Sequence, residues 1–329
     1  ARSEVHEPAV AASGDRVFYT ANWYSAESSD GGENFSFVNP YPGPFPDPPG
    51  ESFCCDQTMA HDPGSNTVFW LQQFIPGGGT NTGTQRINVD QNSDGTWDCA
   101  YDINTVLVGF PANTWFDFPD LTVSTNFLYH ASNTFTFAGG WAGGYAGRYP
   151  LAELAACATP LTIDAIISGN GSFRFTRGAD TTMYFASHLS AVSLRIWEWP
   201  DDDPTPTSVS RSVTAWSNSS RSCPGPDGRN WCGRHDGRLQ GAFLAGDTVG
   251  FVWTPSQGGG FPFPYMRVST FDSGNELTQL DDIDVWSPDF AFMYPSVSVN
   301  STGQLGGTVM WGGGDTHYAS CLLYTSPSP

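Results

Sequence analysis

The sequence predicts an all-β protein, and specifically a six-bladed β-propeller of four-stranded antiparallel blades. Two observations predict this fold. The 329 residues include 37 Gly, 25 Pro and 14% aromatic residues, which suits short strands joined by tight turns. In addition, one aromatic strand pattern recurs six times at starting positions 51 to 66 residues apart, a period that fits one four-stranded blade. A seven-bladed propeller with a truncated last blade is the alternative.

The six copies are apolar and aromatic, and a polar or Gly-rich loop follows each. They lie at residues 17–24, 68–74, 127–133, 183–189, 249–255 and 309–313. A strand of smaller residues precedes each copy, at residues 8–13, 56–61, 120–125, 172–177, 239–245 and 295–300. Small residues fit the innermost strand of a blade, and the aromatic strand beside it packs between blades. Two further strands follow, as at residues 265–271 and 276–280, and only residues 151–158 look helical.

The charge excludes some classes of partner. The chain has 33 acidic and 13 basic residues, a formal net charge of −20, and every basic residue is Arg. A polyanion needs clustered positive charge, so neither nucleic acid nor an anionic membrane is an expected partner. No apolar run approaches the ~18 residues that span a bilayer, so we expect no membrane insertion. The sequence does not indicate an oligomeric state.

Six cysteines precede the last nine residues: Cys54, Cys55, Cys99, Cys157, Cys223 and Cys232. An even number favours an oxidising compartment, and hence a secreted, periplasmic or extracellular protein. Cys223 and Cys232 flank a short Pro- and Gly-rich loop and are expected to form a disulfide. Cys54 and Cys55 are adjacent, so in a strand they face opposite sides. We expect them to reach the other two cysteines separately, rather than each other.

The last nine residues, 321–329 (CLLYTSPSP), resemble a translated sequencing adapter. We therefore expect one propeller domain over residues 1–320, a non-native tail at 321–329, and a source in an environmental (metagenomic) assembly. On this interpretation Cys321 has no role. The sixth repeat reaches its third strand only at residues 317–320, so its outer strand would come from residues 2–6 or from sequence lost with the natural C-terminus.

Three turns carry a recurring acidic motif. Residues 28–35 (SSDGGENF) match S-x-D-x-G-x-x-aromatic at Ser28, Asp30, Gly32 and Phe35. Residues 270–277 (TFDSGNEL) match it with substitutions at Thr270, Asp272, Gly274 and Leu277, and residues 92–97 (NSDGTW) are a shortened version. The carboxylate would cap turn N–H groups, the Gly would take a positive φ, and the aromatic residue would cover the blade edge. The motif resembles the Asp box (BNR repeat) of the sialidase-like propellers. That resemblance implies a propeller in which Asp30 and Asp272 are structural and lie opposite the active site.

In such propellers the loops before the first strand and after the second strand of each blade gather at one mouth of the channel, where we expect the functional site. Several of the latter loops place Gly runs beside aromatic residues, whose flat faces stack on sugar rings: Trp141, Phe261 and Trp311. The other expected substrate-binding residues are Gln57, Trp115, Arg174, Trp231, Arg234, Arg238, Tyr294 and His317.

Acidic residues supply the candidate catalytic groups, because paired carboxylates are the usual machinery of glycoside hydrolysis. The densest cluster is residues 234–238 (RHDGR), in which Arg could bind a carboxylate and His or Asp could transfer a proton. The catalytic candidates are Asp56, Asp117, Asp120, His235 and Asp236. The sequence does not identify which of them pair.

Two features bound the chemistry. Sialidases carry three separated arginines, the first in an early R-x-P setting, whereas Arg16 is followed by Val-Phe and Arg148-Tyr-Pro comes late. The resemblance therefore transfers no catalytic residue, and classical sialidase activity is not expected. No cofactor is expected to be required. Calcium at residues 201–203 or 281–284 is left open, because no loop spacing there fixes its oxygen ligands.

The leading hypothesis is an extracytoplasmic carbohydrate-active propeller, either a glycoside hydrolase or a polysaccharide (uronate) lyase, acting on a carbohydrate or glycoconjugate at the channel mouth. The alternative is a non-catalytic propeller that binds glycan or protein, lectin-like or part of a surface assembly. An enzyme would bring two acid/base groups into one site, about 5–10 Å apart. A lectin would instead show shallow sites repeated from blade to blade.

Overall fold

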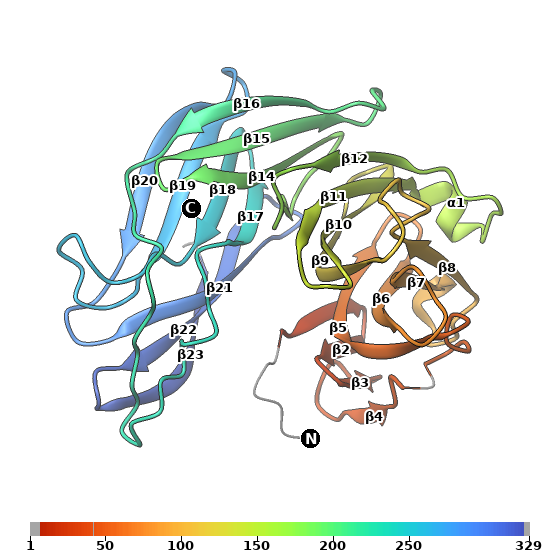
Figure 1. The fold of residues 1–329 in the computed structure, drawn as a ribbon, viewed down its shortest axis with the longest axis horizontal. Coiled ribbons are helices and arrows are strands. Elements are labelled where there is room, and N and C mark those ends of the chain that lie inside the picture. The colour runs from red at the N-terminus through yellow and green to blue at the C-terminus, as the bar shows by residue number, and fades with distance from the viewer. Residues whose placement is uncertain (1–6, 42, 326–329) are drawn as a thin grey trace. The chain divides into compact units, whose positions relative to one another are not determined.

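The computed structural model describes residues 7–41 and 43–325, and it has the fold of a six-bladed β-propeller (Figure 1). Six antiparallel sheets follow one another along the described chain, five with four strands and one with three. The chain divides into two compact units, Ala1–Gly171 and Ser172–Pro329, each of which contains three of these sheets. We describe each unit by itself.

The N-terminal unit contains the first three blades. Blade 1 consists of β1 (Ala9–Ser13), β2 (Arg16–Ala21), β3 (Tyr24–Ser28) and β4 (Ser36–Val38). Blade 2 consists of β5 (Glu51–Asp62), β6 (Thr67–Pro76), β7 (Thr84–Asp90) and β8 (Cys99–Asn104), with a 3₁₀ turn at Gln91–Ser93. Blade 3 consists of β9 (Thr114–Val123), β10 (Phe127–Thr136), β11 (Trp141–Pro150) and β12 (Asp164–Ser168), with α1 (Leu151–Ala155) before β12. The first strands β1, β5 and β9 pack against one another in chain order, as propeller blades do.

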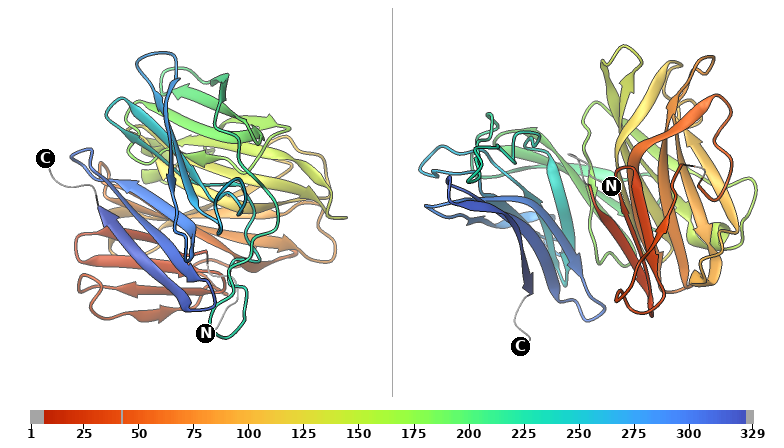
Figure 2. Two further views of the ribbon diagram at one scale, coloured as in Figure 1. Left: turned by 90° about the vertical axis from the view of Figure 1, so that its left-hand side faces the viewer. Right: turned by 90° about the horizontal axis from the view of Figure 1, so that it is seen from below.

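The C-terminal unit repeats this arrangement. Blade 4 consists of β13 (Arg174–Phe175), β14 (Thr182–Ser190), β15 (Ser193–Pro200) and β16 (Thr207–Ser212). Blade 5 consists of β17 (Leu239–Ala245), β18 (Thr248–Trp253), β19 (Met266–Asp272) and β20 (Thr278–Val285). Blade 6 consists of β21 (Ala291–Val299), β22 (Leu305–Gly313) and β23 (His317–Thr325). The first strands β13, β17 and β21 pack in chain order, and Figure 2 lets each blade be followed by colour from two further directions.

The second and third strands of blades 2 and 3 are mostly buried. The first eight residues of β6 are buried, as are seven of the ten residues of β10. A strand covered on both faces reads as a continuous apolar and aromatic run, which is the pattern that recurs six times in the sequence. The predicted second strands therefore agree with β6, β10, β14, β18 and β22 at their cores. In blade 1 the predicted strand, residues 17–24, is too long: β2 ends at Ala21, and a tight turn at Asn22 and Trp23 joins it to β3.

The first strands begin earlier than expected in three blades. The sequence places their starts at residues 56, 120 and 295, whereas β5, β9 and β21 begin at Glu51, Thr114 and Ala291. Each of these strands loses register in its middle: between Phe53 and Gln57 in β5, opposite residues 131–133 in β9, and between Met293 and Ser296 in β21. The expected starts lie at or just after these bulges, because regular alternation begins there.

The three acidic turns join the third and fourth strands of blades 1, 2 and 5. Asp30 accepts hydrogen bonds from the backbone N–H and the side chain of Asn34, and these hydrogen bonds lower the pKa of Asp30 to about 2. In blade 5, Asp272 accepts from the backbone N–H of Gly274.

Two details of the expected turn geometry are wrong. Phe35 is 48% exposed and does not cover the blade edge, whereas Leu277 at the equivalent position is buried. In blade 5 the positive φ falls on Glu276 and Leu277 rather than on Gly274. The hydrogen bond from Gly274 to Asp272 closes this turn early, which moves the left-handed residues further along the chain.

The disulfides differ from expectation in the N-terminal unit. Cys223 and Cys232 are bonded in the C-terminal unit, but Cys54 bonds Cys55, and Cys99 bonds Cys157. The expectation that Cys54 and Cys55 face opposite sides assumed a regular strand. Both lie in the bulge of β5, where the alternation of side chains is lost.

The last described residues belong to β23, in which Cys321, Leu322 and Leu323 pair with Met310, Val309 and Thr308 of β22. The expectation that residues 2–6 complete the sixth blade lies outside the described residues. No helix in the described ranges is long and apolar enough to cross a membrane.

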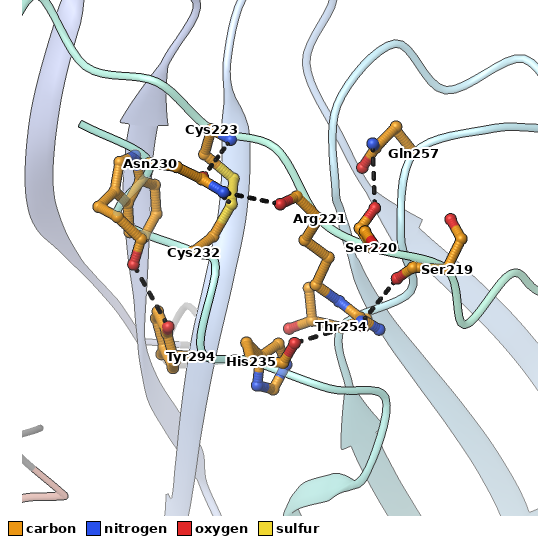
Figure 3. The surroundings of a disulfide bond; sticks show 11 residues. Ser219, Ser220, Arg221, Cys223, Asn230, Cys232, His235, Thr254, Gln257 and Tyr294 are labelled. Carbon is orange, nitrogen blue, oxygen red and sulfur yellow. Dashed lines mark hydrogen bonds between the residues drawn. A yellow bond between two sulfur atoms is a disulfide. The ribbon is translucent and has the colours of Figure 1, made fainter. Parts of the chain in front are cut away.

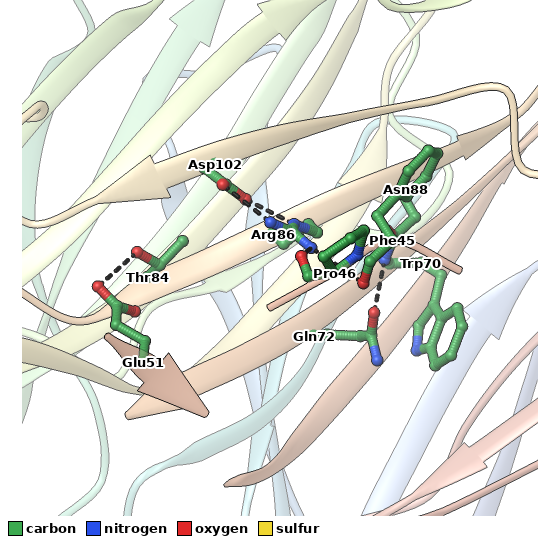
Figure 4. Close-up of polar contacts among 9 residues, drawn as sticks. All are labelled: Phe45, Pro46, Glu51, Trp70, Gln72, Thr84, Arg86, Asn88 and Asp102. Carbon is green, nitrogen blue, oxygen red and sulfur yellow. Dashed lines mark hydrogen bonds and ion pairs between the residues drawn. The ribbon is translucent and has the colours of Figure 1, made fainter. Parts of the chain in front are cut away.

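Polar contacts inside blade 2 fix the start of β5 (Figure 4). Arg86 binds Asp102 through Nε and Nη2, and its Nη1 donates to the carbonyl oxygen of Pro46 at 2.6 Å. Glu51 accepts from the Thr84 hydroxyl at 3.0 Å, while its second carboxylate oxygen is buried with no partner among the described atoms. Burial raises the pKa of Glu51 from 4.5 to about 7. The start of β5 therefore contains a carboxyl group that is protonated in acidic solution and loses its proton near neutral pH.

Replacing Glu51 by Gln is expected to stabilise the protein above pH 7. Between pH 4.5 and about 7 the folded protein holds a proton that the unfolded chain releases, so stability falls as pH rises through this window. Gln removes that loss because it is neutral and nearly isosteric, which should add about 2 kcal/mol at pH 8 and little at pH 4.5. Thermal unfolding of both proteins at the two pH values measures the difference, and an equal gain at both values would contradict the assignment.

Candidate functional site

A buried carboxyl group in the N-terminal unit is the most unusual titratable group there. Asp56 lies at the end of the β5 bulge and is 7% exposed. Its Oδ1 accepts from Nδ2 of Asn22 at 3.3 Å, and its Oδ2 accepts from the backbone N–H of Phe118 at 3.1 Å. Asn22 belongs to the turn between β2 and β3 of blade 1, and Phe118 to the bulge of β9 in blade 3. Three blades therefore converge on this one carboxyl.

The surroundings of Asp56 favour its protonated form. Burial is the main cause that raises its pKa well above the usual range, and the nearby carboxylates of Glu7 and then Asp117 raise it further. The N–H of Phe118 favours the charged form but does not outweigh these effects. Like-charged neighbours that cannot all ionise separate into one proton donor and one or more anions. Burial and these two neighbours thus act in the same direction, toward a protonated Asp56 carboxyl.

A row of aromatic residues begins next to Asp117 on blade 3. Trp115 and Asp117 are two residues apart in the regular part of β9, so their side chains share one face of the sheet. Trp115 contacts Phe135 at 6.0 Å between ring centroids, and Phe135 contacts Trp141 at 5.4 Å. Trp141 is 47% exposed and is held by a hydrogen bond from Nε1 to the carbonyl oxygen of Gly169. This aromatic row offers partly exposed flat surfaces of the kind that stack on sugar rings.

Two predicted residues of this unit have structural roles instead. Gln57 donates from Nε2 to the carbonyl oxygens of Ala21 and Tyr24 and accepts from the Trp70 indole, so it joins blade 2 to blade 1. Asp120 lies beyond the β9 bulge, is 4% exposed, and acts on buried His130 through its charge. Burial nevertheless lowers the pKa of His130 to about 3.

In the C-terminal unit the β16–β17 loop, residues 213–238, holds most of the other predicted residues (Figure 3). Arg221 is 5% exposed and donates to the carbonyl oxygens of Thr254, Ser219 and His235. Asn230 donates to the Arg221 carbonyl and accepts from the N–H of Cys223, beside the Cys223–Cys232 disulfide. The disulfide and the buried guanidinium together fix a loop that has no strand of its own.

The predicted acid and base of this loop are not poised for proton transfer. Asp236 forms a bidentate ion pair with Arg238. Burial alone would raise the pKa of Asp236, but the hydrogen bonds and charge of Arg238 outweigh it and hold that pKa below its usual value. Burial and the charge of Arg221 lower the pKa of His235 to about 3. Asp236 is thus a paired anion and His235 a neutral imidazole at neutral pH.

Several ring N–H donors near this loop are buried without a partner among the described residues. His235 Nδ1 contacts the donating Nε2 of Gln240 at 3.2 Å, which leaves the proton on Nε2, and Nε2 has no partner. Trp216, Trp231 and Trp253 have unpartnered indole nitrogens as well. Buried donors are normally satisfied by protein or ordered water, so this set is a candidate for contacts with an oxygen-rich ligand.

Sequence reasoning missed the aromatic part of this group. His188, at the end of β14, lies 4.7 Å from Trp216 and 5.0 Å from Trp253 between ring centroids. Burial lowers its pKa to about 4. No local motif joins these three residues, which come from blade 4, the β16–β17 loop and blade 5.

The remaining predicted residues are dispersed over the C-terminal unit. Trp311 and His317 lie together with Phe290, at 5.3 Å and 4.8 to 5.5 Å between centroids, on blade 6. Trp231 and His235 both contact Tyr294, which has a positive φ of 53° in the β21 bulge. Phe261 stacks on Tyr265 at 3.9 Å. Arg174 donates to the carbonyl oxygen of Phe173, and Arg234 is exposed.

No protein-family model matches the sequence, and no curated protein sequence matches it. Solved structures do show similarity. The Hadza microbial sialidase Hz136 has a TM-score of 0.55 and 10% identity over 97% of this chain and 65% of its own. The Trypanosoma rangeli sialidase has a TM-score of 0.54 and 10% identity over 97% of this chain and 53% of its own. This chain thus spans about half to two thirds of their length. At these identities the likeness shows that the fold is that of the sialidase-like propellers.

Proposed function

We propose that the protein is a glycoside hydrolase in which Asp56 is the general acid and Asp117 the second carboxylate. The observation that carries this proposal is the buried Asp56 carboxyl, whose pKa is raised by burial and by neighbouring carboxylates. Glycoside cleavage needs one carboxylic acid to protonate the leaving oxygen and one carboxylate to act as nucleophile or base. The surroundings of Asp56 favour the protonated state, and in this proposal Asp117 is the ionised partner.

The aromatic row supports a carbohydrate as the substrate. Trp115 shares a face with Asp117, and Phe135 and Trp141 extend that surface along blade 3. Partly exposed rings beside an acid and a carboxylate would hold the apolar face of a sugar next to the reacting bond. The two solved structures compared above are sialidases, but the early R-x-P arginine is absent, so we expect a glycan other than sialoside.

The test is incubation of the full chain with a panel of neutral and acidic polysaccharides, measuring new reducing ends and unsaturated products together. Reducing ends without unsaturated products support a hydrolase. Unsaturated products would replace the hydrolase by a uronate lyase. Absence of both products across the panel, with measurable glycan binding, would contradict the proposal.

Replacing Trp141 by Ala is expected to raise KM about tenfold with little change in kcat. The ring lies at the exposed end of the aromatic row and contributes binding rather than proton transfer. An aromatic contact of this kind is worth up to about 1.4 kcal/mol, which is one factor of ten. Phe137→Ala is the matched control, because Phe137 is 41% exposed and directly follows β10, in the loop that leads to Trp141 at the start of β11. A fall in kcat alone would count against the binding role.

A second candidate function, glycan binding, rests on the unpartnered donors around the β16–β17 loop. Indole and imidazole N–H groups, together with the exposed Arg234 of the same loop, would bind hydroxyl or carboxylate oxygens of an acidic glycan. Titration of the wild-type protein and of His235→Ala with uronate-containing oligosaccharides by calorimetry tests this function. Equal affinity of the two proteins would exclude this group of residues from binding.

A further inference from the structure

The bulge that holds Asp56 contains a bond that no proposed catalytic role uses. In β5, Phe53 pairs with Phe74 and Gln57 with Gln72, so Cys54, Cys55 and Asp56 together lie opposite the single residue Gln73. A regular antiparallel pair would set one residue there. The disulfide between Cys54 and Cys55 closes within this stretch and draws two adjacent side chains to the same side. The bond therefore lies within the bulge and links the two residues immediately before Asp56.

The partner of this disulfide is itself fixed. Gln73 is fully buried, and its Nε2 lies 3.8 Å from Sγ of Cys55. Oε1 of Gln73 accepts from Gln85, whose own Oε1 contacts Nε2 of His130 at 2.6 Å. His130 is fully buried and also contacts the hydroxyl of Tyr149. A buried polar chain that runs from blade 3 into blade 2 thus ends on the disulfide.

We infer that the Cys54–Cys55 disulfide is the positioning element for Asp56 and makes the carboxyl site sensitive to reduction. This inference rests on the proposed function for its effect on catalysis, but not for its effect on Asp56. Asn22 and Phe118 contact the carboxyl from blades 1 and 3. On blade 2, the position of the carboxyl between these two contacts depends on the backbone of the bulge. Without the bond, the three residues opposite Gln73 regain backbone freedom and Asp56 leaves its buried position.

The chemistry requires a dithiol reductant. One thiolate of the dithiol attacks a sulfur of the Cys54–Cys55 bond, and its second thiolate releases the resulting mixed disulfide. The protein gains two electrons and two protons as two thiols, and the dithiol becomes a disulfide. Cys54 and Cys55 are both partly exposed, which gives the reductant access. The Cys223–Cys232 pair is fully buried and is the less accessible bond.

The test compares the full-length wild-type protein with Cys54→Ser/Cys55→Ser, and uses Cys99→Ser/Cys157→Ser as the control that breaks another disulfide of the same unit. The first readout is amide hydrogen exchange at Phe118, whose N–H is donated to Asp56. The second is the titration of the Asp56 carboxyl, followed by NMR and assigned with Asp56→Asn. Neither readout needs a substrate.

The Cys54/Cys55 variant is expected to exchange the Phe118 amide at least about tenfold faster and to lower the pKa of Asp56 by about one unit or more, while the control changes neither. If the variant does not fold, mild dithiol treatment of the wild type, with the opened bond identified by mass spectrometry, provides the same comparison. Unchanged exchange and titration after loss of the bond would overturn the inference. If the Cys54/Cys55 variant loses the Phe118–Asp56 contact but the wild-type protein cleaves no polysaccharide, the inference stands and the proposed hydrolase activity is refuted.

Discussion

Asp56→Asn is expected to lower kcat/KM about 10²- to 10⁴-fold on the polysaccharide that the wild-type protein cleaves. Asn has the shape of Asp, but its single carbonyl oxygen can accept from only one of Asn22 and Phe118, and it carries no transferable proton. The substitution therefore removes the acid with little change in packing. Initial rates measured from pH 4 to 9 check the result, and the wild-type profile should lose activity at high pH as Asp56 deprotonates.

Stability distinguishes this explanation from simple damage to the fold. Because the folded pKa of Asp56 is raised, ionisation of the wild-type carboxyl costs stability as pH rises. Asp56→Asn should therefore unfold at a temperature no lower than the wild type at pH 8. Asp30→Asn, in an exposed turn of blade 1, is the matched control and should retain activity. A variant that loses activity and melting temperature together would not support the catalytic role.

The parts of the fold that the sequence predicted are those with regular periodicity. The buried second strands β6 and β10 begin with apolar and aromatic runs (VFWL and FLY), and their positions agree with the structure. The first strands of blades 2, 3 and 6 were predicted only from their bulges onward. Phe118-Pro119 and Tyr294-Pro295 show why: in both, an aromatic residue at positive φ precedes a Pro, and this local break reads as a loop boundary.

The same breaks limited the prediction of the site. Asp56 and Asp117 could be listed as candidates because they are acidic and near an expected strand end. Their pairing depends on the burial of Asp56 and on the contact from Phe118, which come from strands about 60 residues apart. The Cys54–Cys55 bond was missed for a related reason, since the alternation argument holds only where a strand is regular. The irregular stretches of the strands thus determine the positions of Asp56, of Phe118 and of the disulfide, and a periodic sequence pattern does not predict such stretches.

Arg221→Met is expected to destabilise the C-terminal unit by about 3 kcal/mol or more. The guanidinium donates to the carbonyl oxygens of Thr254, Ser219 and His235, and Met leaves these acceptors without their charged donor. Hydrogen bonds to a charged group contribute about 1.5–3 kcal/mol each, and a buried acceptor left unpaired adds its desolvation cost. Chemical denaturation measures the loss, and limited proteolysis should cut the β16–β17 loop first.

The same loop provides the control for this prediction. Arg229→Met removes a guanidinium whose side chain is 89% exposed and whose ion pair with Asp227 is long, at 3.8 Å. A surface change of this kind should alter stability by no more than about 0.5 kcal/mol. Equal stability of the two variants would mean that the disulfide alone fixes the loop. A loss confined to Arg221→Met, with the Cys223–Cys232 bond intact, would show that a buried cation and its carbonyl contacts hold the unpartnered donors of this loop in place.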